Sequence, residues 1–279
     1  MFSFNNIKNS NNPLKFLIAK ILIRTKLCTL FTIKQEHYVL KFHPTGLARD
    51  KWMDVNYIHA AEDNFFLDYV KKNNTVIDVG ANIGTVTLLL ANIVGKNGNV
   101  YSIEPHPTTH RYLVENIKLN KFENVTTFNI ALGEKSMQVN FSNFKSDDQN
   151  KILNLGSKLS INMSKLDDLP IKESMIDLLK IDTIGYEKFV LLGANSLLKK
   201  CQVVQFPIGG AYHKFSEYYG YNFKEILDLL RKNNFRLYSY DQKKTLSEIL
   251  DYDIPPKGDL LAIANINDFL TRTGYSQKA

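Results

Sequence analysis

The sequence predicts an α/β fold built on a doubly wound, mainly parallel sheet of seven strands, preceded by a helical N-terminal extension. Three observations lead to this prediction. Short β-branched and apolar runs alternate along the chain with longer segments of helical periodicity. One run, residues 75–79, contains an acid and leads into a turn with two glycines. The 279 residues are 44% hydrophobic, which is enough for one large core without a second full domain.

Seven runs have the length and composition of buried strands. They are Val76–Val79, Val100–Ile103, Val125–Ile130, Ile176–Ile181, Gln202–Phe206, Phe235–Tyr240 and Leu260–Ala264. Helical patterns lie between most of them, over Ile83–Val94, Pro107–Leu119, Glu187–Leu198 and Phe223–Lys232. Such alternation implies right-handed crossovers and helices on both faces of the sheet. The polar stretch Ser142–Gln149 predicts a surface loop between the third and fourth strands.

The turn after the first strand predicts a ligand-binding loop. Asp78 lies at the end of the strand, and the turn reads Gly80-x-Asn82-x-Gly84, so bare backbone can approach a ligand closely. The apolar helix that follows offers unpaired N–H groups to an anion. The spacing differs from the dinucleotide fingerprint G-x-G-x-x-G, and no Lys-Ser or Lys-Thr pair follows for a triphosphate.

A second acid, Glu104, closes the next strand twenty residues past Gly84, where a ribose-binding acid belongs. The two motifs together resemble those of class I S-adenosylmethionine-dependent methyltransferases, which have a Rossmann-like fold. Further motifs resemble those of the FkbM family of this class over about residues 48–240. The order of these motifs along the chain is more specific for the family than any single motif. The motifs are Glu104-Pro105-His106-Pro107, Asn116 with Asn120, Ala131-Leu132-Gly133, Leu178–Asp182 and Gly185-Tyr186-Glu187.

The resemblance implies S-adenosylmethionine as cofactor and assigns it binding residues. These are Asp78, Gly80, Asn82, Gly84, Glu104, His106 and Asn129. Asp78 would orient the loop and the cofactor amino group, and Glu104 would accept hydrogen bonds from both ribose hydroxyls. His106 and Asn129 follow the second and third strands, where adenine would lie. Alternatively, Asp78 is a helix cap, and His106 and Asn129 are turn residues.

On the acceptor side, Asp182 closes the fourth strand and is the first catalytic candidate. Methyl transfer to a hydroxyl needs alignment and removal of a proton, and a carboxylate serves either task; alternatively, Asp182 caps the helix that follows. His213 is the second candidate base, or else a surface histidine. Cys and His residues lack metal-ligand spacing, so no metal is expected.

Two positions depart from the family pattern. Family members usually have the motif Asp-x-Glu-Gly, and in this chain Ile184 stands in place of its glutamate. They often have Phe-Glu-x-Gly-Gly after the fifth strand, and here Pro207 stands in place of that glutamate. The resemblance therefore implies O-methylation of a hydroxyl on a sugar or small metabolite, in a less acidic pocket than usual. Two alternatives stay open: a pseudo-methyltransferase that binds cofactor without efficient catalysis, and a module that acts through the N-terminal helix.

The chain divides into a basic extension, residues 1–47, and a methyltransferase domain, residues 48–279. Residues 1–41 hold seven Lys or Arg against one acid, which leaves a net charge of only +1 for the rest. Nucleic acid is therefore not expected as a partner. One helical stripe is apolar: Leu14, Leu17, Ile18, Ile21 and Leu22. It either packs on its own domain, or residues 14–26 contact a membrane surface or a partner.

Location and assembly are less constrained by the sequence. The charges of Lys15, Lys20, Arg24 and Lys26 argue against a transmembrane helix, and no long uncharged apolar stretch predicts a signal peptide. Cys28 and Cys201 lie far apart without a disulfide framework, which favours a reducing compartment and a cytoplasmic location. Nothing in the sequence indicates an oligomeric state.

Overall fold

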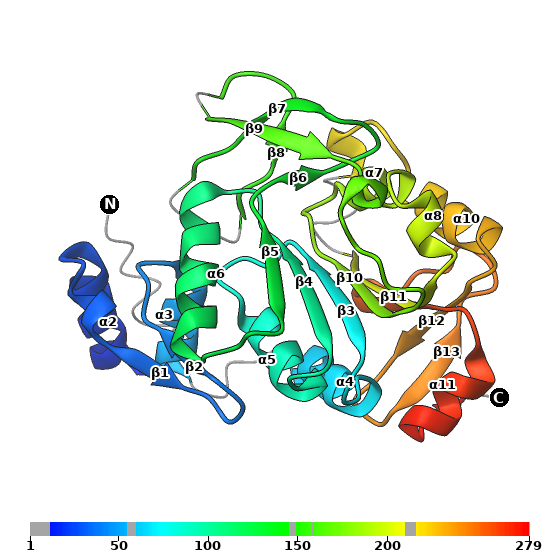
Figure 1. The fold of residues 1–279 in the computed structure, drawn as a ribbon, viewed down its shortest axis with the longest axis horizontal. Helices are drawn as coiled ribbons and strands as arrows, with labels where there is room; N and C mark the ends of the chain where they lie inside the picture. The colour runs from blue at the N-terminus through cyan, green and yellow to red at the C-terminus, as the bar shows by residue number, and fades with distance from the viewer. Residues whose placement is uncertain (1–11, 55–59, 145–148, 158, 210–215, 279) are drawn as a thin grey trace.

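The computed structural model describes residues 12–54, 60–144, 149–157, 159–209 and 216–278. Within these ranges it confirms the predicted fold class (Figure 1): a nine-stranded central sheet has the order β15-β13-β12-β14-β11-β10-β3-β4-β5. The seven predicted strands are all present. They are β3 (Thr75–Val79), β4 (Asn99–Ile103), β5 (Val125–Phe128), β10 (Ile176–Ile181), β11 (Cys201–Gly209), β12 (Arg236–Tyr240) and β14 (Lys257–Ile263). Two short strands, β13 (Thr245–Glu248) and β15 (Ser276–Gln277), extend one edge beyond the predicted seven.

Strand β3 lies inside the sheet and pairs in parallel with β4 on one side and β10 on the other. The chain builds β4 and β5 outward from β3, and then returns to add β10 and β11 on the opposite side. Strand β14 is antiparallel to both β11 and β12. The strand order therefore reverses between β3 and β10, and ligands bind at the carboxyl ends of strands at such a point.

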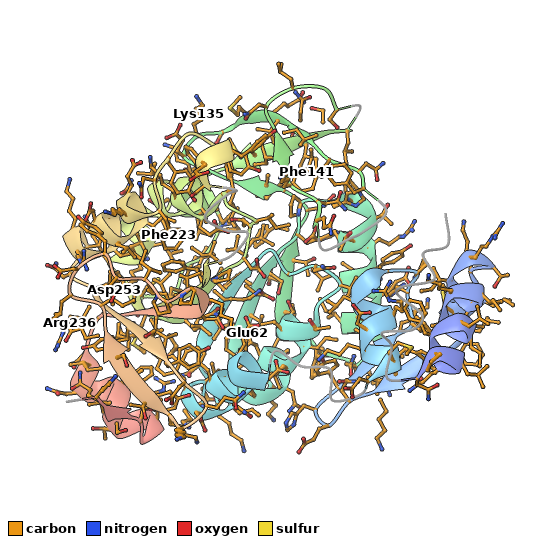
Figure 2. The ribbon with its side chains drawn as sticks, turned by 180° about the vertical axis from the view of Figure 1, so that it is seen from behind. Glu62, Lys135, Phe141, Phe223, Arg236 and Asp253 are labelled. Carbon is orange, nitrogen blue, oxygen red and sulfur yellow. The ribbon has the colours of Figure 1, made fainter. Side chains whose placement is uncertain are left out.

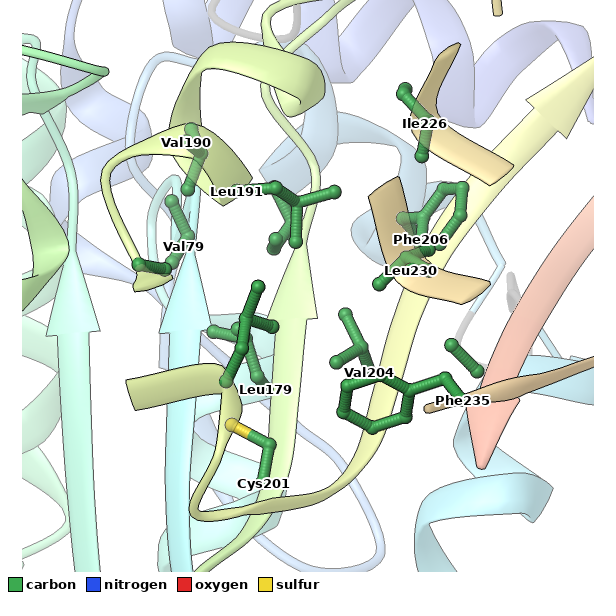
Figure 3. Packing of buried hydrophobic residues seen from close by; sticks show 14 of the residues in the cluster. Val79, Leu179, Val190, Leu191, Cys201, Val204, Phe206, Ile226, Leu230 and Phe235 are labelled. Carbon is green, nitrogen blue, oxygen red and sulfur yellow. The ribbon is translucent and has the colours of Figure 1, made fainter. Parts of the chain in front are cut away.

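Helices cover both faces of the sheet, as predicted. One face carries α4 (Ala60–Tyr69), α5 (Thr85–Val94) and α11 (Ile266–Thr273), whose buried Phe65, Leu90 and Phe269 share a cluster. The other carries α7 (Glu187–Leu192), α8 (Asn195–Leu198) and α10 (Lys224–Lys232). Figure 3 shows Leu191 and Leu230 of this layer around Val204 of β11.

Two short helices, α7 and α8, replace the single helix predicted over Glu187–Leu198. The break falls at Gly193, where an added Cβ would lie 2.1 Å from the Gly133 carbonyl oxygen. Close approach of two backbone segments therefore interrupts an apolar pattern that is continuous in the sequence. By contrast, α6 (Pro107–Leu119) has the predicted bounds, with His106 as its N-cap residue.

A second, four-stranded sheet follows β5, where only a surface loop was predicted. Its strands are β6 (Ala131–Leu132), β7 (Met137–Phe141), β8 (Ile152–Leu153) and β9 (Leu159–Ser164), in the order β6-β9-β7-β8. Ser142–Phe144 and Gln149 of the predicted loop lie between β7 and β8, and residues 145–148 lie outside the described ranges. Strand β9 alternates buried and exposed positions, a weak signal beside the apolar runs of the central sheet. Figure 1 shows this sheet beyond the end of β5.

The N-terminal extension contains α2 (Pro13–Arg24), η1 (Leu27–Leu30), β1 (Thr32–Lys34), β2 (Val39–Lys41) and α3 (Gly46–Met53). Helix α3 crosses the predicted domain boundary at 47. Two family-motif amides hold the hairpin β1–β2 against α6: Asn120 Oδ1 accepts from Val39 N at 2.7 Å, and Asn116 Oδ1 accepts from Lys41 N at 2.8 Å. The extension is therefore joined to the domain by specific hydrogen bonds.

Candidate active site

A cavity of about 350 Å³ opens at the carboxyl ends of β3, β4 and β10. Its volume lies in the range of about 300–1,000 Å³ that is typical of small-molecule sites. Three loops and the small sheet contribute most of the wall. The lining includes Gly80, Ala81, Asn82, Ile103, Glu104, Pro105, Ile130, Ala131, Leu132, Phe141, Ile152, Lys180, Asp182, Ile184 and Tyr186, with Leu47 and Asp50 from α3 and Glu62 from α4.

The glycine loop after β3 needs its two glycines for different reasons. Gly80 has φ +83°, and a Cβ there would lie 1.9 Å from the Asp182 carbonyl oxygen, so backbone contact excludes any side chain. Gly80 N also donates to Ile103 O at 2.9 Å. Gly84, with φ +96°, is the N-cap residue of α5. The loop is thereby fixed to both neighbouring strands.

The Glu104 carboxylate lies in the cavity wall and is oriented by backbone donors. Its Oε2 accepts from Asn82 N at 2.9 Å, and its Oε1 accepts from His106 N at 2.8 Å. These bonds join the glycine loop to the segment after β4. The structure thus brings together two elements of the predicted cofactor site, the Gly80–Gly84 loop and Glu104.

Asp78 lies beneath the wall and is fully buried. Thr87 Oγ1 donates to its Oδ2 at 2.7 Å, and Lys180 Nζ lies 3.3 Å from its Oδ1. It is not among the residues that line the cavity. Its contacts position the β3 loop and Lys180, and direct contact with a cofactor stays a prediction.

Lys180 connects Asp78 to Asp182, the predicted catalytic residue. Its buried ammonium lies 3.9 Å from Asp182 Oδ2, and the Asp182 side chain is 38% exposed at the cavity wall. Burial by itself lowers the pKa of Lys180, but the carboxylates of Asp78, Asp182 and Glu62 raise it above its usual value. Lys180 therefore remains positively charged and lies beside Asp182 in the cavity wall.

Glu62 is a cavity residue that the sequence analysis missed. It projects from α4 (Figure 2), is 8% exposed, and has Gln205 Nε2 3.5 Å from its Oε1. Burial raises the pKa of Glu62 to about 8. The nearby charge of Lys180 lowers this pKa, whereas the charges of Asp259 and Asp182 raise it further. One signal was available: Glu62 precedes Phe65 and Phe66 by three and four positions, an acid on the apolar face of a helix.

We expect the free energy of unfolding to depend on pH through Glu62. Below its ordinary pKa of 4.5 the side chain is protonated in both states. Between 4.5 and about 8 the unfolded chain loses this proton while the folded chain keeps it, so stability falls as pH rises. Urea unfolding should show wild type losing stability relative to Glu62→Gln as pH rises across this window, because the glutamine side chain does not titrate. Exposed Glu36→Gln is the control, and a pH-independent difference for Glu62→Gln would contradict the shift.

The remaining predicted site residues are placed as follows. His106 Nδ1 accepts from Thr109 N at 3.4 Å, and its Nε2 lies 3.1 Å from Asn143 Oδ1. Asn129 Nδ2 donates to Glu104 O at 2.9 Å. Both side chains stabilise loops, and neither is among the described residues that line the cavity. His213 lies outside the described residues.

Apolar residues line the cavity near the small sheet instead. Ile130, Leu132 and Phe141 are in the wall. The sequence analysis placed Ile130 in a strand and Leu132 in a family motif, but it gave none of the three a site role. They provide apolar surface in the same cavity as Glu104. This arrangement suits an aromatic base whose attached sugar reaches a carboxylate.

Ile184 adopts φ +54°, a conformation that β-branched residues rarely adopt. Glu187 holds this turn, because its Oε1 accepts from Thr183 N and Gly185 N at 3.0 Å each. Burial raises the pKa of Glu187 to about 7. The turn therefore presents Ile184 to the cavity where the family pattern has an acid.

Pro207, the second departure, pairs in register with Asp259 of β14. Asp259 in turn contributes to the raised pKa of Glu62. Carboxylates from α4 and β14 thus lie in the region where the sequence analysis expected acids to be missing. Within the described ranges, no three His, Cys, Asp or Glu side chains gather as metal ligands would.

Comparisons with known proteins show what this chain is similar to. A model of the methyltransferase FkbM domain matches residues 78–237. The tRNA(Phe) (4-demethylwyosine(37)-C(7)) aminocarboxypropyltransferase of Methanocaldococcus jannaschii is 50% identical over 54 residues, 19% of this chain and 21% of that protein. The chain thus matches about a fifth of the length of this curated relative.

Solved structures with a related fold include M. jannaschii TYW2 in complex with AdoMet. It is 20% identical, with 82% of each chain covered and a TM-score of 0.41. A SAM-dependent methyltransferase from Aquifex aeolicus is 15% identical, with 73% of this chain and 89% of that chain covered and a TM-score of 0.43.

Proposed function

The chain belongs to the FkbM methyltransferase family, and from this premise we propose that it methylates a hydroxyl oxygen of a sugar or other small metabolite. It is an S-adenosylmethionine-dependent enzyme. The observation that supports the proposal is one cavity whose wall contains Glu104 and residues 80–82 of the glycine loop together with Asp182 and Glu62. Donor and acceptor sites are thereby adjacent.

The residues present fit the cofactor. Glu104 has a fixed direction from its two backbone donors and suits a pair of ribose hydroxyls. Ile130, Leu132 and Phe141 offer an apolar wall for adenine. The loop from Gly80 to Gly84 brings backbone close to the methionine end. S-adenosylmethionine, when bound, supplies a methyl carbon on a positively charged sulfur.

At the acceptor end, Asp182 accepts the hydrogen bond of the acceptor hydroxyl and then takes its proton. S-adenosylmethionine held in this cavity would supply the methyl group to that oxygen, with the electron pair of the carbon–sulfur bond staying on sulfur, and Asp182 would hold the released proton. Lys180, 3.9 Å from Asp182 and 3.3 Å from Asp78, holds the carboxylate in place. Alignment of oxygen and methyl carbon supplies much of the rate.

The wall around Asp182 indicates the kind of acceptor. Ile184 and Tyr186 supply apolar and aromatic surface, and Glu62 and Asp182 supply polar groups. A ring with several hydroxyls can pack one face on such a wall and direct one hydroxyl to a carboxylate. Glu62 also favours catalysis over the cofactor-binding alternative, because it places a carboxyl group where Ile184 and Pro207 replace family acids.

RNA is a second acceptor class to be tested, since the relative from M. jannaschii acts on tRNA(Phe). We favour a small acceptor, because residues 42–279 carry a net charge of only +1. Proteins that hold RNA through its phosphates normally present a basic face.

Calorimetric titration with S-adenosylmethionine, followed by turnover assays on sugars, hydroxylated metabolites and unmodified tRNA, tests the proposal. We expect cofactor binding and an O-methylated small product identified by mass spectrometry. Failure to bind the cofactor would refute the donor site. Binding with methyl transfer to tRNA alone, or with no transfer to any hydroxyl acceptor, would refute the proposed acceptor class.

A further inference from the structure

One surface of the N-terminal extension exposes large apolar side chains. Seven of the sixteen exposed large apolar or tyrosine side chains in the described part of the chain belong to residues 14–31. We call this set the α2–η1 surface: Leu14, Leu17, Ile18, Ile21, Leu27, Leu30 and Phe31. Leu14 is 69% exposed and Leu30 is 76% exposed. Scattered single exposures are ordinary, but a concentration of this kind marks an interaction site.

The opposite side of α2 is packed against the protein, so the exposed side is a fixed face. Ala19 is fully buried. Lys15 Nζ donates to Met53 O at 3.2 Å and lies 5.7 Å from the centroid of the Trp52 ring. Figure 1 shows α2 at the edge of the molecule, beside α3 and away from the central sheet, and Figure 2 shows its side chains projecting outward. The predicted stripe is therefore mostly turned away from the domain, with Leu22 as its partly buried member.

The charged residues of the segment that carries this surface all have one sign. Residues 12–35 contain Lys15, Lys20, Arg24, Lys26 and Lys34 and no acid. Two copies of the chain joined through this surface would bring these cations together, which opposes self-association. An anionic surface complements them, and the exposed leucines and isoleucines would enter its apolar layer.

We propose that the α2–η1 surface docks on the anionic face of a lipid bilayer, with α2 lying in the plane of the interface. With 12 residues α2 is about 18 Å long, shorter than the ~30 Å apolar core of a bilayer. No helix in the described ranges is long and apolar enough to cross a membrane. Docking places the enzyme at the bilayer surface while its cavity stays in the aqueous phase.

Vesicle co-sedimentation of the full chain tests this proposal. We expect binding to vesicles that contain about 30% phosphatidylglycerol, which gives them an anionic surface. Binding to vesicles of pure phosphatidylcholine should be weak. Ile18→Ser with Leu30→Ser should lower binding by about tenfold or more, because two exposed apolar anchors are lost. Leu250→Ser is the matched control, since Leu250 is also 76% exposed but lies far along the chain from residues 14–31.

The charge is tested separately by Lys20→Gln with Arg24→Gln, which should weaken binding to anionic vesicles and reduce its dependence on salt. Cofactor affinity and melting temperature should stay unchanged in all variants, which shows that the fold is intact. Equal binding to both kinds of vesicle would overturn the proposal. A dimer in the absence of lipid that Ile18→Ser with Leu30→Ser dissociates would overturn it too, in favour of a second copy as the occupant.

Discussion

Replacing Asp182 by Asn is expected to lower turnover by about 10²–10⁴-fold, the usual contribution of a positioned acid or base. The amide has nearly the shape of the carboxylate, but at neutral pH it does not take up the proton of the hydroxyl that is methylated. Asp182 lies at the cavity wall, 3.9 Å from Lys180, while Lys180 keeps its 3.3 Å contact with Asp78. The buried ammonium therefore stays paired and the fold should be retained. Single-turnover rates with saturating cofactor and acceptor measure the effect.

The control for Asp182→Asn is Asp228→Asn, which removes the same charge from an exposed position on α10. It should leave turnover unchanged. Cofactor affinity should be the same in both variants, because Asp182 is assigned to the acceptor end. If the turnover of Asp182→Asn is within about twofold of wild type, Asp182 is not the base and another group takes the proton.

Replacing Glu104 by Gln is expected to weaken S-adenosylmethionine binding by about 10- to 100-fold. A hydrogen bond to a charged group contributes about 1.5–3 kcal/mol, which corresponds to this factor for one such bond. The variant also turns an NH₂ group toward one of the two backbone donors, Asn82 N or His106 N. Both effects act on the cofactor end of the cavity. Calorimetric titration of the full chain measures the loss.

Glu173→Gln is the matched control for Glu104→Gln. Glu173 Oε1 accepts from Tyr101 Oη at 2.8 Å, so it contacts β4, the strand that Glu104 follows, but it does not line the cavity. Cofactor affinity should survive this change. The melting temperature without cofactor separates loss of binding from loss of folding, and a Glu104→Gln variant with wild-type affinity would remove Glu104 from the ribose site.

Local signals in the chain identified most of the central sheet. The inner strands β3 and β10 are short runs that are buried along their whole length, and such runs are recognised because burial on both faces favours apolar residues in them. The small sheet β6–β9 was missed for the opposite reason, since its strands are short and half exposed. The split of α7 from α8 depends on Gly193 contacting Gly133, which are far apart in sequence.

The cofactor motifs could be read from the sequence because they lie within one βαβ unit, where spacing and geometry are linked. The Gly80–Gly84 loop and Glu104 are joined in the structure by the hydrogen bond from Asn82 N. His106 and Asn129 were predicted from position alone; their side chains stabilise loops, and their contact with the cofactor stays a prediction. A residue that follows a strand need not point toward the ligand, because the local turn decides its direction.

The sequence by itself determined the fold class, the family and the cofactor, because these depend on motifs whose residues lie close together in the chain. Only the tertiary structure placed Glu62 beside Lys180 and Asp182, and turned the apolar stripe of α2 away from the domain. These facts depend on which helix packs against which strand, and on which side of a helix meets its neighbour. Such choices are made by the summed burial of many distant residues, and no single stretch of sequence encodes them.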